Sequence, residues 1–173
     1  FPAPGTRVQP SQAGRMAALV SNQHGVILAE PRAHHYRFIG IEIKPEDNTL
    51  LRDLVLLGDN TARSLDDLPH HIILDRCYVH GDPKKGSRRG VVMNGRHLAV
   101  VDSHVSGFRE EGQDSQAVVG WGGSGPFKVE NNFLEGAGEN LLFGGGDPSI
   151  RDLVPSDIEI RHNHFFKPLS WKI

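Results

Sequence analysis

The stretches GPFKVENNFLEG (125–136) and SDIEIRHNHFFK (156–167) have the same spacing of apolar residues. Apolar side chains hold the third, fifth and tenth positions of both. Three further segments align with them without gaps: HHYRFIGIEIKP (34–45), HHIILDRCYVHG (70–81) and RHLAVVDSHVSG (96–107). Recurrence of one pattern along a chain is the sequence sign of a repeat architecture. These five copies therefore decide the fold.

Each copy reads as two short strands joined by a tight corner, because apolar and polar residues alternate on either side of the eighth position. That position holds Ile41, Cys77, Ser103, Asn132 and Asn163. Asn suits a corner because it tolerates left-handed backbone and forms local hydrogen bonds. Stacked Asn side chains can also bond to one another. The copies therefore predict an asparagine ladder that runs from coil to coil.

A second apolar ladder precedes each copy, in the segments HGVILAE (24–30), RDLVLLGDN (52–60), RGVVMNG (89–95), QAVVGWGG (116–123) and ENLLFGGG (139–146). The side chains expected to point inward are Val26/Leu28, Leu54/Leu56, Val91/Met93, Val118 and Leu141/Phe143. One unit therefore contains three strands. A single coil cannot bury its apolar face, but coils stacked about 4.8 Å apart pair every strand with its successor. An antiparallel sandwich also uses many short strands, but it does not explain why one order recurs five times.

The predicted fold is therefore an all-β parallel β-helix, or β-solenoid, of about five coils. The length of 173 residues fits one domain. The 20 glycines and 11 prolines suit turns and short strands. We place the β-helix domain at 24–173 and an N-terminal arm at 1–23. Within the arm, SQAGRMAALV (11–20) is expected to form a short capping helix that begins at Ser11 and covers the edge of the first coil.

Composition narrows the classes of function. The net charge of −2 gives no electrostatic basis for binding nucleic acid or a membrane surface. No apolar run approaches the roughly 20 residues that a membrane span needs, so no membrane insertion is expected. The single cysteine, Cys77, excludes an internal disulfide and a cysteine-based zinc cluster. The chain begins without Met and ends without a polar tail, and we expect it to be a piece of a longer protein.

The segments DSQAVVGWGGSGPFKVENNFLEGAGENLLFGG and LVPSDIEIRHNHFFKPLSW resemble the right-handed parallel β-helix superfamily, the pectate-lyase-like fold. Within it they are similar to secreted bacterial β-helix-repeat proteins of uncharacterised function. The resemblance covers roughly 24–167. It implies a right-handed coil with three sheets, an extracellular or cell-surface location, and a polysaccharide or glycan as partner. Lyases of this superfamily use an Arg or Lys base and calcium on Asp or Glu. No motif here matches that pattern residue for residue, so no role is transferred and calcium has no motif to support it.

Stacked coils place equivalent residues in rows. The row that precedes the first ladder is predicted to read His24, Arg52, Arg89, Gln116 and Glu139. Arg89 and Glu139 should lie two coils apart, about 10 Å at the strand spacing. With Gln116 between them, this row either binds a uronate carboxylate and sugar hydroxyls or forms a solvated strip of mixed charge.

The two most charged loops are HGDPKKGSRRG (80–90) and GFREEGQDSQ (107–116), and they follow the third strand of successive coils. We therefore expect them to be neighbours. Their opposed charges form either a salt-bridged surface or a polar cleft, and loops on rigid scaffolds often carry function.

The two loops and the row supply candidate catalytic side chains. A lyase needs a basic side chain as proton acceptor, for which the candidates are Lys85, Arg89 and Arg109. A hydrolase needs two carboxyl groups, for which the candidates are Glu111 paired with Asp114 or with Glu139. Trp121, between glycines in GWGGSG, is either a platform for a sugar ring or is buried against the next loop. Gln116 is the second candidate for carbohydrate binding.

Histidines recur at the second position of the repeat, in His35, His71 and His97. We expect a structural stack, and no metal site, because imidazoles in a parallel stack splay apart. Asp82, Asp114 and Asp147 carry oxygen atoms that suit calcium, but they are scattered over separate loops.

Two hypotheses of function follow. The first is a secreted, carbohydrate-directed β-helix domain, resembling a polysaccharide lyase or a glycoside hydrolase, whose groove follows the first ladder and the two charged loops. The second is a non-catalytic solenoid, such as a fibre, adhesin or cell-surface protein, whose open coil ends associate with further copies.

Overall fold

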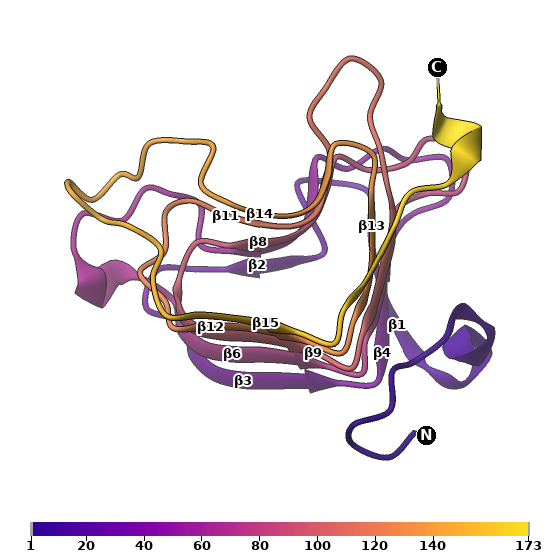
Figure 1. Cartoon of the computed structure of the whole chain (residues 1–173), viewed down its shortest axis with the longest axis horizontal. Helices are drawn as coiled ribbons and strands as arrows, with labels where there is room; N and C mark the ends of the chain where they lie inside the picture. Colours follow the sequence, from indigo (N-terminus) through magenta and orange to yellow (C-terminus); the bar gives the residue numbers. More distant parts are fainter. Residues whose placement is uncertain (1, 173) are drawn as a thin grey trace.

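The computed structural model describes residues 2–172, which form a parallel β-helix of five coils (Figure 1). Each coil contributes one strand to each of three sheets, and every strand pair is parallel. Sheet B contains β2 (Ile27–Ala29), β5 (Asp53–Leu57), β8 (Arg89–Met93), β11 (Gln116–Gly120) and β14 (Glu139–Phe143). Sheet C contains β3 (His34–Ile39), β6 (His70–Asp75), β9 (Arg96–Val101), β12 (Phe127–Glu130) and β15 (Ile158–Arg161). Sheet A contains β1 (Ala17–Ser21), β4 (Ile41–Pro45), β7 (Tyr78–His80), β10 (His104–Phe108), β13 (Phe133–Gly136) and β16 (His164–Phe166).

The predicted rows of sheets C and A are confirmed. Phe127 pairs with Leu98 in the preceding coil and with Ile158 in the following one. In sheet A, Val79 pairs with Ile43 and with Val105. The central members of these rows are fully buried in one core between the three sheets. Each such aliphatic side chain stabilises the fold by roughly 1.5–3 kcal/mol.

The predicted ladder forms at the corner between sheets C and A. Asn132 Oδ1 accepts the Ser103 N–H at 2.8 Å, and Asn163 Oδ1 accepts the Asn132 N–H at 2.9 Å. Ser103 Oγ continues the chain by accepting the Cys77 N–H at 3.0 Å. The sequence suggested that the ladder residue itself has the left-handed backbone. In the structure the residue before it has this conformation in every coil: Gly40, Arg76, Asp102, Asn131 and His162. The turn is made there, which leaves the next side chain free to point into the ladder.

The prediction for sheet B was half right in the first two coils: Leu54 is buried in the core and Val26 packs against it, as predicted, but Leu28 and Leu56 are not inward residues. Val55 pairs with Val91 and Leu57 with Met93, so Leu57 rather than Leu56 occupies the inward row. Leu28 is 47% exposed, whereas its neighbours Ile27 and Ala29 pack against the core. Because side chains alternate along a strand, a slip of one residue exchanges the two faces.

The N-terminal arm differs in part from its prediction. Its helix is a 3₁₀ helix, η1 (Pro10–Arg15), and the Gln9 N–H, not Ser11, makes the N-terminal contact, to Gln12 Oε1 at 2.7 Å. The end of the predicted helix is instead strand β1, which pairs with β4 and so covers the first-coil edge of sheet A. In Figure 1 the part of the arm that precedes β1 lies outside the coil, beside β1 and β4.

Two further 3₁₀ helices are η2 (Leu65–Asp67) and η3 (Leu169–Trp171). None of the helices within residues 2–172 has the length and apolar character needed to cross a membrane.

Candidate functional site

A groove of about 800 Å³ lies where the chain passes from sheet A to sheet B. Its walls come from the loops after β7, β10 and β13 and from the segment after β16. In Figure 1 the loop between β10 and β11 rises above the coil on the side where the C-terminus lies. Four of the predicted site residues line this groove together: Lys85, Arg109, Glu111 and Asp114.

The two charged loops are neighbours, as predicted. Ser87 and Arg109 form an antiparallel bridge. Arg109 Nη2 donates to the backbone oxygens of Pro83 and Lys84 at 3.2 and 3.3 Å, and Arg88 Nε donates to the Asp114 backbone oxygen at 2.9 Å. Backbone carbonyls thus hold the loops together.

Apart from the guanidinium groups of Arg88 and Arg109, the charged side chains of the two loops take no part in joining them. Within residues 2–172, no ion pair joins a Lys or Arg of one loop to a Glu or Asp of the other. Of the two arrangements open to the sequence, a salt-bridged surface or a polar cleft, the structure therefore has the cleft. The charged ends of Lys85, Glu111 and Asp114 line the cleft and are free to contact a ligand.

Asp82 gives the basic loop its shape. Its carboxylate is buried and accepts the backbone N–H groups of Asn48, Lys84 and Lys85 at 2.8, 2.9 and 2.7 Å. Burial by itself would raise the pKa of Asp82, but these three hydrogen bonds and the charge of Lys84 outweigh burial and lower it. Asp82 therefore fixes the backbone from which Lys84 and Lys85 project.

Trp171 is a groove residue that sequence reasoning missed. The Arg109 guanidinium lies 5.6 Å from the centre of its ring. Lys167 holds the same segment in place, because its ammonium donates to the backbone oxygens of Gly136, Ala137 and Gly138. One signal was present in the sequence: the segment after β16 occupies the position at which earlier coils place their charged loops.

The predicted polar row lies on sheet B from the second coil to the fifth, with two changes of member. His24 of the first coil is not part of it, because Ile27 pairs with Val55 and so places Gly25 opposite Asp53. Arg89 pairs in register with Asp53 and Gln116, so Asp53, not Arg52, belongs to the row. Arg89 Nη1 lies 3.3 Å from Asp53 Oδ1, Arg89 Nε donates to Gln116 Oε1 at 3.2 Å, and Gln116 Nε2 donates to Glu139 Oε2 at 2.8 Å. The row is one continuous chain of contacts across four coils. Partial burial lowers the pKa of Arg89, and the charge of Asp53 opposes that change.

Trp121 lies away from the groove, at the end of β11. The Arg89 guanidinium is 5.3 Å from the centre of its ring. The loop after β14 also approaches it so closely that a Cβ on Gly146 would lie 3.1 Å from Trp121 Cδ1. Trp121 is therefore partly covered by Arg89 and by a neighbouring loop, and its role in carbohydrate binding stays a prediction.

The histidine stack is confirmed. The ring centres of His35 and His71 are 4.6 Å apart, and those of His71 and His97 are 4.3 Å apart. A second stack, which the sequence did not suggest, joins His34 and His70 at 5.0 Å.

Comparison with protein-family models, with curated proteins and with solved structures finds no match to this chain. The geometry of the groove and of the rows is therefore the basis on which a function can be proposed.

Proposed function

We propose that this protein is a secreted, pectate-lyase-like β-helix domain that binds an acidic polysaccharide in the groove between its charged loops. The observation that supports the proposal is the set of unpaired charges in that groove. Lys85, Glu111 and Asp114 line it, and within residues 2–172 none of their charged ends has an ion-pair or hydrogen-bond partner. Charged side chains without partners on tightly anchored loops are suited to contact a ligand.

The shape of the groove favours an extended chain as ligand. Its walls come from successive coils, which follow one another about 4.8 Å apart along the solenoid axis. A linear polymer can therefore lie across several loops at once. Its volume of about 800 Å³ falls in the usual range of roughly 300–1,000 Å³ for ligand sites.

The chemistry of the walls favours a uronate-containing sugar. Lys84, Lys85 and Lys172 offer ammonium groups to carboxylates, and the acidic side chains can accept hydrogen bonds from hydroxyls. Trp171 places an aromatic ring in the same wall. Such a ring offers an apolar face to a sugar.

If the groove is also catalytic, Lys85 is the base that fits a lyase best. Arg109 is engaged with two backbone oxygens and with Trp171, and Arg89 is engaged with Asp53 and Gln116. Only the ammonium of Lys85 is free among these three candidates. A hydrolase would instead use Glu111 and Asp114, which line the same groove.

A glycan panel tests this proposal. Polygalacturonate, alginate and hyaluronan would be compared with neutral dextran and xylan, with ultraviolet detection of unsaturated uronates and assay of released reducing ends. We expect retention by at least one acidic polymer and by neither neutral one. Unsaturated products would indicate a lyase, and reducing ends without unsaturation would indicate a hydrolase. The absence of both binding and product would reject the carbohydrate proposal.

A second candidate function, a structural solenoid, is favoured by the exposed apolar side chains of both end coils. In the first coil Leu28 and Tyr36 are 47% and 53% exposed, and in the last Ile160 and Phe165 are 46% and 50% exposed. Head-to-tail contact between two different ends generates open filaments rather than closed rings. Light scattering over a wide concentration range tests this candidate. Growth with concentration supports it, and a monomer throughout contradicts it.

A further inference from the structure

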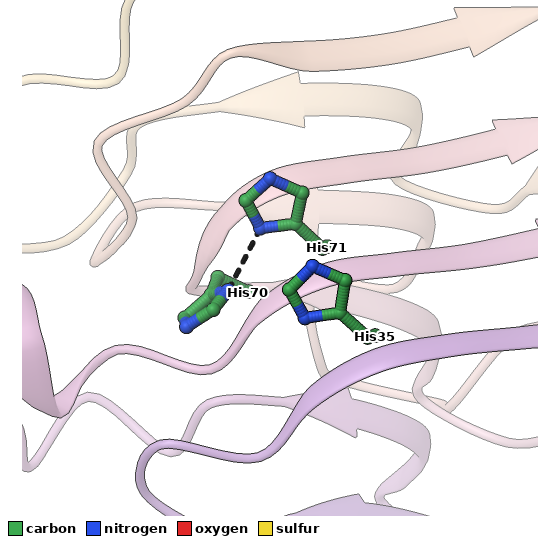
Figure 2. Close-up of side chains that lie close together, drawn as sticks. All are labelled: His35, His70 and His71. Atoms are coloured by element: carbon green, nitrogen blue, oxygen red, sulfur yellow. Dashed lines mark hydrogen bonds between the residues drawn. The ribbon is translucent and has the colours of Figure 1, made fainter.

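Four histidines gather where the first two coils enter sheet C. His34 and His35 belong to β3, and His70 and His71 belong to β6. They form two adjacent stacks, one of His34 and His70 and one of His35 and His71, which His97 extends into the third coil. Figure 2 shows the rings of His35 and His71 one above the other, with His70 edge-on beside them.

The backbone explains why the two stacks face each other. His35 and His71 have left-handed φ angles of 61° and 54°, whereas His34 and His70 before them are the first residues of strands β3 and β6 and are not left-handed. This turn sets the two rings of each pair nearly perpendicular, at 90° for His34 and His35 and 80° for His70 and His71. As a result their Nδ1 atoms approach to 2.8 and 2.7 Å.

Imidazole nitrogens, which can act as metal ligands, therefore come close together between the two stacks. The expectation that stacked imidazoles splay apart holds within one stack, but it does not apply across the two. Ligand nitrogens of His35, His70 and His71 all lie within 4.8 Å of one another. A tetrahedral zinc ion, with Zn–N bonds of about 2.0–2.1 Å, needs ligand nitrogens about 3.3 Å apart. His35 and His71 are exposed and His70 is half-buried, so side-chain rotation of the two exposed rings is the movement that would bring the nitrogens to that spacing.

The protonation state of the cluster also suits a metal. In each Nδ1–Nδ1 contact one ring donates a proton and the other accepts it with its lone pair, as neutral imidazoles do. A metal takes the place of that shared proton when the donor ring carries its proton on Nε2 instead.

The donor set selects the kind of metal. The three residues supply only imidazole nitrogen and no carboxylate. Calcium and magnesium prefer oxygen ligands, whereas zinc, copper, nickel and cobalt accept imidazole.

We propose that His35, His70 and His71 bind one divalent transition-metal ion of the zinc class, which joins the first two coils at the start of sheet C. The site is separate from the groove, and the proposal does not depend on carbohydrate binding.

Calorimetric titration of the full chain, without a polyhistidine tag, with zinc chloride and with cobalt chloride tests the proposal. We expect about one equivalent of either metal, and for cobalt the visible absorption of a nitrogen-bound ion. His71→Asn should weaken binding at least tenfold, because it removes one of three ligands and Asn tolerates the left-handed backbone. His24→Asn is the matched control, since His24 is exposed and has φ 55°, close to the 54° of His71. Its affinity should equal that of the unaltered chain.

A second readout separates loss of ligand from loss of fold. Zinc should raise the melting temperature of the unaltered chain and of His24→Asn, because an ion that binds the folded state stabilises it. It should not raise that of His71→Asn, whose circular dichroism should match the unaltered chain. The proposal is overturned if neither metal binds, if His71→Asn binds as tightly as the control, or if zinc leaves the melting temperature of the unaltered chain unchanged.

Discussion

Every coil changes direction at the corner between sheets C and A and again at the loop between sheets A and B, and the two places are built differently. At the corner, Ser103, Asn132 and Asn163 hydrogen-bond to one another and repeat one geometry. At the loops, backbone carbonyls hold the chain and charged side chains such as Lys85 and Glu111 remain unpaired. The difference indicates that the corner supplies stability, and it is the reason why we propose that the loops contact a ligand.

The corner should show the largest effect of a single substitution on stability. Asn132→Ala would leave the buried Ser103 N–H and the Val100 backbone oxygen without their side-chain partner. Each buried group left unsatisfied costs about 1–3 kcal/mol, so we expect a loss of about 2–5 kcal/mol in the free energy of unfolding. Urea denaturation measures this loss. A loss below 1 kcal/mol would show that the ladder is not a main source of stability.

His104, which follows the corner residue Ser103, should make stability depend on pH. Burial lowers the pKa of His104 to about 4, and the charges of Arg7, His80 and His164 act in the same direction. The unfolded chain takes up this proton near pH 6.5, whereas the folded chain does not until about pH 4. Stability is therefore full above about pH 6.5 and falls as the pH drops toward 4, by about 2–3 kcal/mol.

The measurement is the free energy of unfolding at several values between pH 7 and pH 4.5, for the unaltered chain and for His104→Phe. Phe fits beside Phe133, on which the His104 ring stacks at 4.3 Å. This variant should lose the part of the slope that comes from His104. Equal slopes in the two chains would show that His104 titrates normally.

The polar row on sheet B should behave like the corner rather than like the loops. Arg89→Met removes the partner of Asp53 and of Gln116 and should lower the free energy of unfolding by about 1–3 kcal/mol. It should leave affinity for an acidic polysaccharide unchanged, because Arg89 is not a groove residue. Urea denaturation and affinity electrophoresis check the two parts. Weaker polysaccharide binding with unchanged stability would show that Arg89 contacts the ligand and does not stabilise the sheet.

The loops should show the smallest effect on stability. Glu111→Gln removes an exposed charge that has no partner within residues 2–172, and we expect a change below about 0.5 kcal/mol. If Glu111 acts with Asp114 in a hydrolase, the same substitution should abolish release of reducing ends. A stability change above 1 kcal/mol would show that the loop charges are part of the scaffold.

The sequence predicts the corner well because its signal is local. Strict alternation in the five copies sets which side chains point inward, and the rows that contain Phe127 and Val79 followed directly. Alternation is missing in the early strands of sheet B, where Leu54, Val55, Leu56 and Leu57 are all apolar. A run of that kind fits either register, which is why Arg52 was predicted in place of Asp53.

The candidate site was predictable only in part, because it depends on the conformation of the loops between the strands. Loop order placed Lys85 and Arg109 together, since they follow the third strand of successive coils. The place of Trp171 depends on how the chain turns after β16, and Lys167 fixes that turn through three carbonyls of another loop. The perpendicular histidine pairs depend on the left-handed backbone of His35 and His71. No local sequence pattern predicts that conformation at these two residues.

Affinity electrophoresis through polygalacturonate, alginate and hyaluronan in turn tests the central claim most directly, with the unaltered chain, Lys85→Ala and Lys128→Ala run side by side. Lys128 lies on sheet C, away from the groove, and serves as the matched lysine control. The account predicts that at least one of these polymers retards the unaltered chain and Lys128→Ala equally and retards Lys85→Ala much less. Equal retardation of all three chains, or no retardation by any of the polymers, would contradict it.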